Sequence, residues 1–319
     1  MAVESLAQRE LTDWILAQRP GRASVSHERP YGFFLEEERS ASGRIVLSGC
    51  ILLTNKECPW RCLMCDLWKH TLTESVPPGA IPRQIRYGLA QFSSRPEQLK
   101  LYNSGSFFDA AAIPRADYQA IAEEIAFARN IVVESHPRLI GKRATELQAL
   151  LPGSLEVAMG LETVHPEVFP RLNKRFSLAD FAHAAEFLRS RNIGVRAFVL
   201  VQPPYMKGIE SVEWAVKSAA FAFDCGATVV SLIPTRPGNG ALEKLIQTGD
   251  FIPPRLSMLE QAQELALKDT RGRIFADTWE LEQFSNCTSC FESRRQRLQQ
   301  NNLTQKVLPA VECPACNGS

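Results

Sequence analysis

Three cysteines in the first quarter of the chain have a spacing that can support redox chemistry. Cys58, Cys62 and Cys65 form the pattern C-x3-C-x2-C directly after an apolar run. Thiolates are the usual protein ligands of iron–sulfur clusters, and three of them in one tight loop can converge on one cluster. A 4Fe–4S cluster has four irons, so three ligands leave one iron open to chelate an amino group and a carboxylate. The alternative is a zinc site completed by His70, but structural zinc usually takes paired C-x2-C units.

Four further cysteines lie near the end of the chain. Cys287 and Cys290 form one C-x2-C pair, and Cys313 and Cys316 form a second. Two such pairs are typical of a tetrahedral zinc site. The same spacing suits an auxiliary iron–sulfur cluster, so the sequence predicts zinc or a second cluster here, with zinc favoured.

Short apolar runs alternate with amphipathic stretches through most of the chain. The expected strands cover 45–53, 99–102, 131–134, 155–161, 195–201, 229–233 and 273–278. The expected helices cover 81–92, 118–128, 178–191, 212–224 and 240–247, with one more inside 1–20. Strands and helices in alternation predict β/α crossovers and a parallel sheet, with ligands bound at the carboxyl ends of the strands. The polar stretch 21–42 is expected to be irregular.

The cysteine spacing and its place after the first of these strands resemble the signature of the radical S-adenosylmethionine (SAM) superfamily. The resemblance implies an α/β fold, a partial (β/α)6 barrel of the TIM type, here with a small cysteine-rich C-terminal extension. It also implies a 4Fe–4S cluster, S-adenosyl-L-methionine as cofactor and an electron donor such as flavodoxin or ferredoxin. In such enzymes SAM is cleaved reductively to a 5′-deoxyadenosyl radical, which abstracts hydrogen from a substrate.

Later motifs resemble one branch of that superfamily, the radical subunit of archaeosine synthase and the related elongator-type radical core. These motifs are Asn103-Ser104-Gly105-Ser106-Phe107, Glu134-Ser135-His136-Pro137, Gly160-Leu161-Glu162-Thr163, Asn173-Lys174 and Gln202-Pro203-Pro204. The chain departs from the branch at His136, which replaces an arginine, and in the segment 232–239, which lacks two asparagines. These departures predict the same cofactor chemistry with a different substrate.

The resemblance also implies roles for individual residues. Ser104, Gly105 and Ser106 form the loop that would bind the amino group of the cofactor. Glu162 is expected either to face the ribose hydroxyls, which a carboxylate can accept from, or to be a surface carboxylate. Arg196 is expected to pair with the methionyl carboxylate or to be a structural ion-pair partner. His136 is either a substrate contact or a histidine satisfied within its loop.

Composition restricts the partners. The chain has 36 basic and 35 acidic residues and a formal net charge of +1, so no global positive field draws it to nucleic acid. A local basic patch would still allow tRNA to bind. Since no run of about 18 apolar residues occurs, no membrane span is expected. The N-terminus does not resemble a secretory signal, and the expected compartment is the cytoplasm.

We expect three segments: an N-terminal helix with an irregular lead-in over 1–44, the core barrel over 45–280, and a cysteine-rich tail over 281–319. Three classes of function remain open at this point. The first is a radical SAM enzyme that modifies a nucleoside, with tRNA as a candidate. The second is a radical SAM enzyme that acts on a free metabolite or peptide, and the third is a non-catalytic metal-binding module. The sequence names neither the substrate nor the oligomeric state.

Overall fold

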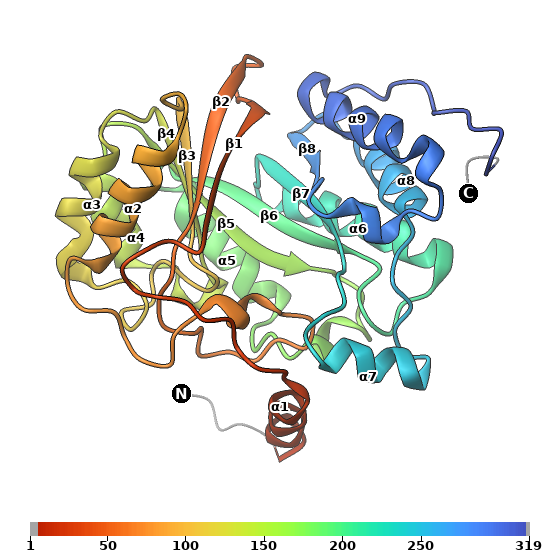
Figure 1. Ribbon diagram of the computed structural model, residues 1–319, viewed down its shortest axis with the longest axis horizontal. Helices are drawn as coiled ribbons and strands as arrows, with labels where there is room; N and C mark the ends of the chain where they lie inside the picture. The colour runs from red at the N-terminus through yellow and green to blue at the C-terminus, as the bar shows by residue number, and fades with distance from the viewer. Residues whose placement is uncertain (1–5, 317–319) are drawn as a thin grey trace.

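A single curved sheet is the centre of the computed structural model, which describes residues 6–316 (Figure 1). Its eight strands follow the order β1-β2-β3-β4-β5-β6-β7-β8. β1 is antiparallel to β2, and all other neighbours are parallel. The strands are β1 (Gly32–Arg39), β2 (Ile45–Leu52), β3 (Gln98–Tyr102), β4 (Asn130–Glu134), β5 (Ser154–Glu162), β6 (Gly194–Val201), β7 (Val229–Pro234) and β8 (Arg273–Ala276).

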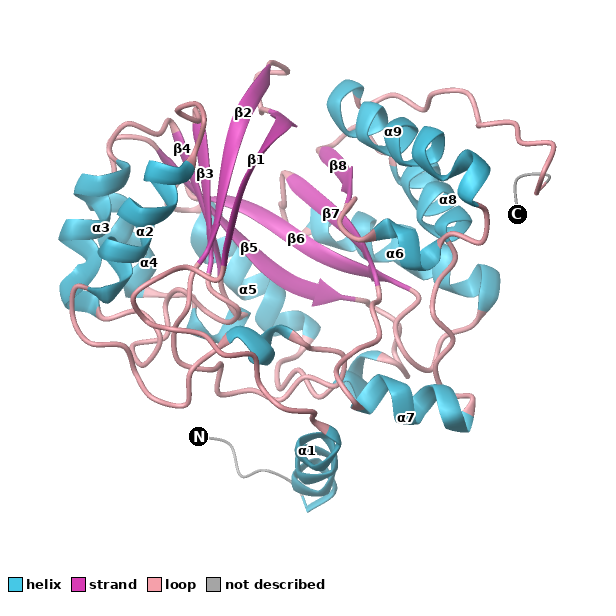
Figure 2. Ribbon diagram, viewed as in Figure 1, coloured by secondary structure: helices cyan, strands magenta, loops and turns pink. Residues whose placement is uncertain are grey.

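Helices follow most of the parallel strands and cover the outer side of the sheet, as Figure 2 shows. The helices are α1 (Leu6–Gln18), α2 (Ala80–Gln91), α3 (Tyr118–Ile125), α4 (Lys142–Leu150), α5 (Leu178–Arg189), α6 (Gly208–Asp224), α7 (Ala241–Thr248), α8 (Leu256–Ala266) and α9 (Thr288–Thr304). Of these, α1 and α7 lie beyond one end of the sheet rather than on its outer side. Short 3-10 helices lie at Leu67–His70, Arg115–Asp117, Pro137–Leu139, Phe169–Leu172 and Leu281–Phe284. The expected α/β half-barrel is confirmed. Over 6–316, the structure contains no helix with the length and apolar character that a membrane crossing requires.

The largest difference from the sequence expectation is β1, which lies in the stretch expected to be irregular. Two of its acidic residues, Glu36 and Glu38, pair with Lys100 of β3. A strand with carboxylates on its inner face does not show the apolar alternation by which strands are recognised. The expectation was therefore wrong for a physical reason: beside its backbone pairing with β2, this strand is held by charge pairs that no apolar alternation announces.

The concave face of the half-barrel carries a buried ionic network. Arg196 of β6 is 2.6 Å from Glu156 of β5 and 2.6 Å from Glu38 of β1. Burial raises the pKa of Glu38, but the charges of Arg196 and Lys100 outweigh it and hold the pKa well below its usual range. β1 and β6 are far apart in the strand order, so a direct contact between them requires the sheet to curve around this network.

The network predicts a stability effect. Removing one partner of a buried ion pair leaves an uncompensated charge, which costs about 3–5 kcal/mol. We therefore expect Glu38→Gln to lower the free energy of unfolding, measured by urea titration, by about that amount. The matched control is Glu213→Gln, which breaks an exposed i,i+4 pair with Lys217 and should cost about 0.5 kcal/mol or less. Equal effects of the two substitutions would contradict a supporting role for the network.

The last helix completes the sheet at β8. The side-chain amide of Asn302 accepts from the Ala276 backbone N–H at 2.8 Å and donates to the Ala276 carbonyl at 2.9 Å. Gln305 does the same for Ile274, at 2.7 and 2.8 Å. Arg39 of β1 donates to the Leu303 carbonyl at 3.0 Å. The end of α9 therefore holds both outer strands of the sheet.

Candidate functional site

The loop after β2 carries Cys58, Cys62 and Cys65 and lies at the carboxyl end of the sheet. Backbone hydrogen bonds from Glu57 to Leu72 and from Leu72 to Asn55, both 2.8 Å, close its base. All three thiols are free and half-buried. Burial raises the pKa of Cys58 to about 12, with the neighbouring Cys62 as the next cause. A bound metal reverses this balance, because coordinated thiols are deprotonated.

The spacing of these thiols bears on the kind of metal that fits them. A single zinc ion holds its sulfurs about 3.8 Å apart, since Zn–S bonds are about 2.3 Å and tetrahedral. Within the described part of the chain, the only group of three or more potential ligands packed within 4.8 Å of one another is in the tail. His70, the alternative fourth zinc ligand, stacks on Tyr31 at 4.7 Å. The loop cysteines are not part of that tail group, and a 4Fe–4S cluster, in which each thiolate binds a different iron, does not require the close packing that a single zinc ion does.

The loop after β3 lies directly against the cysteine loop. A Cβ atom on Gly105 would lie 3.3 Å from the Cβ of Cys58, so glycine permits this approach. The half-buried Glu134 accepts, through its carboxylate, the backbone N–H of Asn103 at 2.6 Å and that of Gly105 at 3.4 Å. Burial raises the pKa of Glu134 to about 7 against the opposing effect of these N–H groups. The backbone of the glycine loop is thus held by Glu134, a motif residue to which the sequence assigned no role of its own.

The two serines of this loop are held by protein partners. Tyr31 and Ser104 share a hydrogen bond of 2.8 Å between their hydroxyls, and Ser104 has φ 54°. Ser106 accepts the backbone N–H of His136 at 2.9 Å. The loops after β3 and β4 are therefore joined beside the cysteine loop.

His136 is satisfied within the protein. Its ring stacks on Trp60 of the cysteine loop with a centroid separation of 3.6 Å and an interplanar angle of 7°. Nδ1 accepts the Arg138 backbone N–H at 3.2 Å, so Nε2 carries the proton and donates to the Lys174 carbonyl at 2.7 Å. Burial lowers the pKa of His136 to about 3, and the ring is neutral. Of the two roles expected for this residue, the geometry favours the loop-satisfied one.

Glu162 lies at the end of β5, where the register with β6 shifts and its own φ is 68°. Its carboxylate is buried and forms an ion pair of 2.5 Å with Lys174. Glu162 is thus a buried residue and not the surface carboxylate that the sequence left as an alternative.

Arg196 is the site residue that the structure places elsewhere. It belongs to the amino half of β6, and its guanidinium is bound by Glu38 and Glu156. The sequence left two roles open for it, and the structure assigns it the structural ion pair. The expected pairing with a methionyl carboxylate is corrected accordingly, because the other candidate groups lie at the carboxyl ends of the strands.

Backbone strain concentrates in the loops at this end of the sheet. Most of the non-glycine residues with positive φ among those described lie there: Ser104, Glu162, Asn173, Arg175, Gln202 and Tyr205. Strained conformations cluster at functional sites, where surrounding structure holds them.

Several buried polar atoms in the same loops have no protein partner. They are Asn55 Oδ1, both amide atoms of Asn103, and Gln202 Oε1. An unpaired buried polar atom costs free energy unless a ligand or water supplies the bond. The residues at the strand ends therefore fit a polar cofactor.

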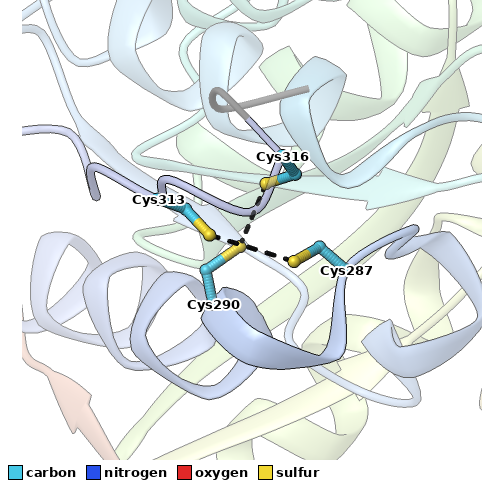
Figure 3. Close-up of side chains that lie close together, drawn as sticks. All are labelled: Cys287, Cys290, Cys313 and Cys316. Atoms are coloured by element: carbon cyan, nitrogen blue, oxygen red, sulfur yellow. Dashed lines mark hydrogen bonds between the residues drawn. The ribbon is translucent and has the colours of Figure 1, made fainter.

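The four tail cysteines converge on one point, as Figure 3 shows. Their sulfurs lie within 4.8 Å of one another, with 3.9 Å between Cys287 and Cys313 and 3.6 Å between Cys290 and Cys316. Cys287 is the N-cap of α9, and the backbone N–H of Cys290 is the main cause that lowers the pKa of Cys287 to about 6. The arrangement provides four sulfur ligands for a metal.

Comparison with known proteins gives the family. No protein-family model matches the chain. The archaeosine synthase subunit beta of Thermococcus kodakarensis is 30% identical over 225 residues, which cover 68% of this chain and 69% of that protein. The chain belongs to this family. The corresponding subunit of Methanosarcina acetivorans is 23% identical over 65% of this chain and 63% of its own length.

One further relative and one solved structure extend the comparison. An uncharacterised Methanocaldococcus jannaschii protein is 23% identical over 91% of this chain and 85% of its own length. The archaeal Elp3 of Methanocaldococcus infernus has the same fold, with a TM-score of 0.51 and 13% identity over 74% of this chain and 60% of that chain. The resemblance that the motifs implied is confirmed at the level of the family and the fold.

Proposed function

We propose that the protein is a radical SAM enzyme whose 4Fe–4S cluster is held by Cys58, Cys62 and Cys65. The observation that carries the proposal is the meeting of the cysteine loop, the glycine loop and the strained, buried Glu162 at the carboxyl end of a radical SAM fold. When bound, the cluster and SAM supply a 5′-deoxyadenosyl radical that abstracts hydrogen from the substrate.

The residues of the chain then have distinct tasks. The thiolates of Cys58, Cys62 and Cys65 would hold the cluster, which would supply an open iron for SAM. The loop containing Ser104, Gly105 and Ser106 offers backbone groups to the cofactor amino group, because glycine leaves room against Cys58. Glu162 accepts from ribose hydroxyls. An external one-electron donor of the flavodoxin or ferredoxin type supplies the electron.

For the substrate we propose a modified nucleoside in tRNA, because the relatives in this family are named archaeosine synthase subunits. The alternative is a free metabolite or peptide. The test is anaerobic reconstitution with iron, sulfide and dithionite, followed by measurement of 5′-deoxyadenosine with tRNA or with small metabolites added. Stimulation by tRNA alone supports the nucleoside proposal, whereas stimulation by metabolites alone overturns it.

The cofactor loop gives a direct prediction. Gly105→Val places a branched side chain against Cys58, so we expect SAM affinity measured by anaerobic calorimetry to fall at least tenfold, about 1.4 kcal/mol. Gly141→Val is the matched control, because a Cβ atom at Gly141 meets nothing within 4 Å. Unchanged affinity in a folded Gly105→Val variant that holds its cluster would remove this loop from the cofactor site.

For the tail we propose a structural zinc ion on Cys287, Cys290, Cys313 and Cys316. The sulfur separations of 3.6 and 3.9 Å lie close to the value of about 3.8 Å expected around one tetrahedral zinc. A second iron–sulfur cluster is the alternative; as a 4Fe–4S cluster it requires wider spacing, since each sulfur then binds a different iron.

A further inference from the structure

A buried ion pair lies beside the loop that holds the proposed cluster ligands. Lys174 Nζ is 2.5 Å from Glu162 Oε1, and the two side chains are only 8% and 10% exposed. A buried pair of this kind is screened little by solvent or salt, so its charges act strongly on their surroundings. The structural network on the concave face uses other residues, which leaves this pair without a role in closing the sheet.

Two hydrogen bonds hold the Lys174 segment next to Cys62. The Leu63 backbone N–H donates to the Leu172 carbonyl at 3.0 Å, and Asn173 Nδ2 donates to the Arg61 carbonyl at 2.7 Å. Arg61 and Leu63 are the two neighbours of Cys62 in the chain, so the segments run side by side at this cysteine. The position of the lysine is therefore fixed by the backbone on both sides of a proposed iron ligand.

A third contact holds the same lysine from another direction. His136 Nε2 donates to the Lys174 carbonyl, and the His136 ring stacks on Trp60 of the cysteine loop. The cysteine loop, the β4 loop and the Lys174 segment are thus one connected unit.

The electrostatics agree with this placement. Burial alone lowers the pKa of Lys174, but Glu162 and the thiols of Cys62 and Cys65 raise it above its ordinary value. The ion pair with Glu162 holds Lys174 as an ammonium, and the backbone contacts place its segment beside Cys62.

We propose that Lys174 is a positioning residue that sets the reduction potential of the cluster through a fixed positive charge beside Cys62, and that Glu162 attenuates this charge. This inference rests on the proposed function. It adds a role for the Glu162–Lys174 pair in electron uptake, apart from any contact between Glu162 and the cofactor.

The sign follows from charge balance. The oxidised 4Fe–4S cube together with its three thiolates has a net charge of −1. Uptake of one electron from the external donor makes the net charge −2, and no bond is made or broken. A nearby ammonium stabilises the more negative, reduced form and so makes the cluster easier to reduce. A nearby carboxylate has the opposite effect.

The experiment is an anaerobic redox titration of the full-length reconstituted protein without SAM, with dithionite as the reductant and the EPR signal as the measure of reduced cluster. For Lys174→Gln we expect the ratio of reduced to oxidised cluster at the wild-type midpoint to fall about tenfold, a negative shift of about 59 mV for one electron. For Glu162→Gln we expect a shift of opposite sign. Lys174→Arg keeps the charge and should restore a potential close to that of the wild type.

Lys100→Gln is the matched control, because it also removes a buried, ion-paired lysine but lies on β3 within the structural network. It should lower stability without moving the potential. If Lys174→Gln and Glu162→Gln lower stability and leave the potential unchanged, the pair is merely structural and the inference is overturned. If Lys174→Gln loses its cluster, Glu162→Gln decides: a positive shift supports the inference, and no shift or a negative one overturns it.

This failure differs from failure of the proposed function. A wild type that cannot assemble a cluster on Cys58, Cys62 and Cys65 overturns both. A wild type that assembles it and cleaves SAM, with an unchanged potential in both pair variants, overturns the inference alone.

Discussion

Replacing the three loop cysteines together, as Cys58→Ala, Cys62→Ala and Cys65→Ala, is expected to abolish formation of 5′-deoxyadenosine. The wild type, reconstituted anaerobically and reduced, should give an EPR signal that shifts when SAM is added, because SAM binds the open iron. The triple variant should give no such signal. The main apolar core lies between the sheet and its helices and contains none of these residues. We therefore expect the variant to fold, with a far-UV circular dichroism spectrum like that of the wild type.

Cys225→Ala is the control for this prediction, since Cys225 is a free, half-buried cysteine at the end of α6 and belongs to neither group. It should keep both the signal and its shift. A triple variant that retained an EPR signal responsive to SAM would show that the cluster is bound elsewhere, with the tail cysteines as the first place to examine.

Loss of the tail metal should have the second largest effect, this time on stability. In Cys287→Ser combined with Cys313→Ser, zinc measured by elemental analysis should fall from about one ion per chain to none, while the loop cluster keeps its iron. Structural zinc contributes folding free energy, about 10–16 kcal/mol in peptides that fold only with the metal. Here α9 also packs through the buried Leu298, so the variant should lose only part of this folding free energy. We expect the melting temperature to fall by about 5–10 °C.

Metal content also decides between the two versions of the tail site. If the tail holds a second iron–sulfur cluster, the wild type should contain roughly twice the iron of the double variant and no zinc. Removing zinc with a chelator and adding it back should restore the melting temperature if the site is structural. Four freely titratable tail thiols in a folded wild type grown with ample iron and zinc would contradict both versions.

Much of the fold could be predicted because its parallel strands are buried runs of Val, Ile and Leu. Such runs can be recognised in the sequence without knowing which strands lie beside them, and so can the polar, glycine and proline residues of the turns that end them. β1 was missed because Glu36 and Glu38 find their partners on strands distant in sequence, which no local pattern reveals. The helix α9 was missed for a related reason. It is polar along much of its length, so it shows no apolar stripe, and the polar residues at its end, Asn302 and Gln305, bind the backbone of β8 instead of facing solvent.

In the candidate site, too, features set by local sequence could be predicted, and features set by partners distant in sequence could not. Spacing alone singled out the two cysteine groups, because ligand spacing is a local property of the chain. The role of Arg196 needed three dimensions, since its carboxylate partners come from β1 and β5. Trp60, Glu134 and Lys174 were not named as site residues. Glu134 and Lys174 belong to two of the family motifs, and this membership was the only sequence signal that pointed to them. Trp60 lies between the loop cysteines, but no sequence pattern indicates that it contacts another site residue.

The side-chain amides of Asn302 and Gln305, at the end of α9, have a consequence for how copies of the chain meet. A strand at the end of a sheet presents unpaired N–H and C=O groups that invite strand addition by another chain. Asn302 and Gln305 each fill one donor and one acceptor of β8, as a neighbouring strand would. Their amides occupy the backbone groups through which a second molecule would extend the sheet. Self-association by sheet extension at β8 therefore requires α9 to detach first.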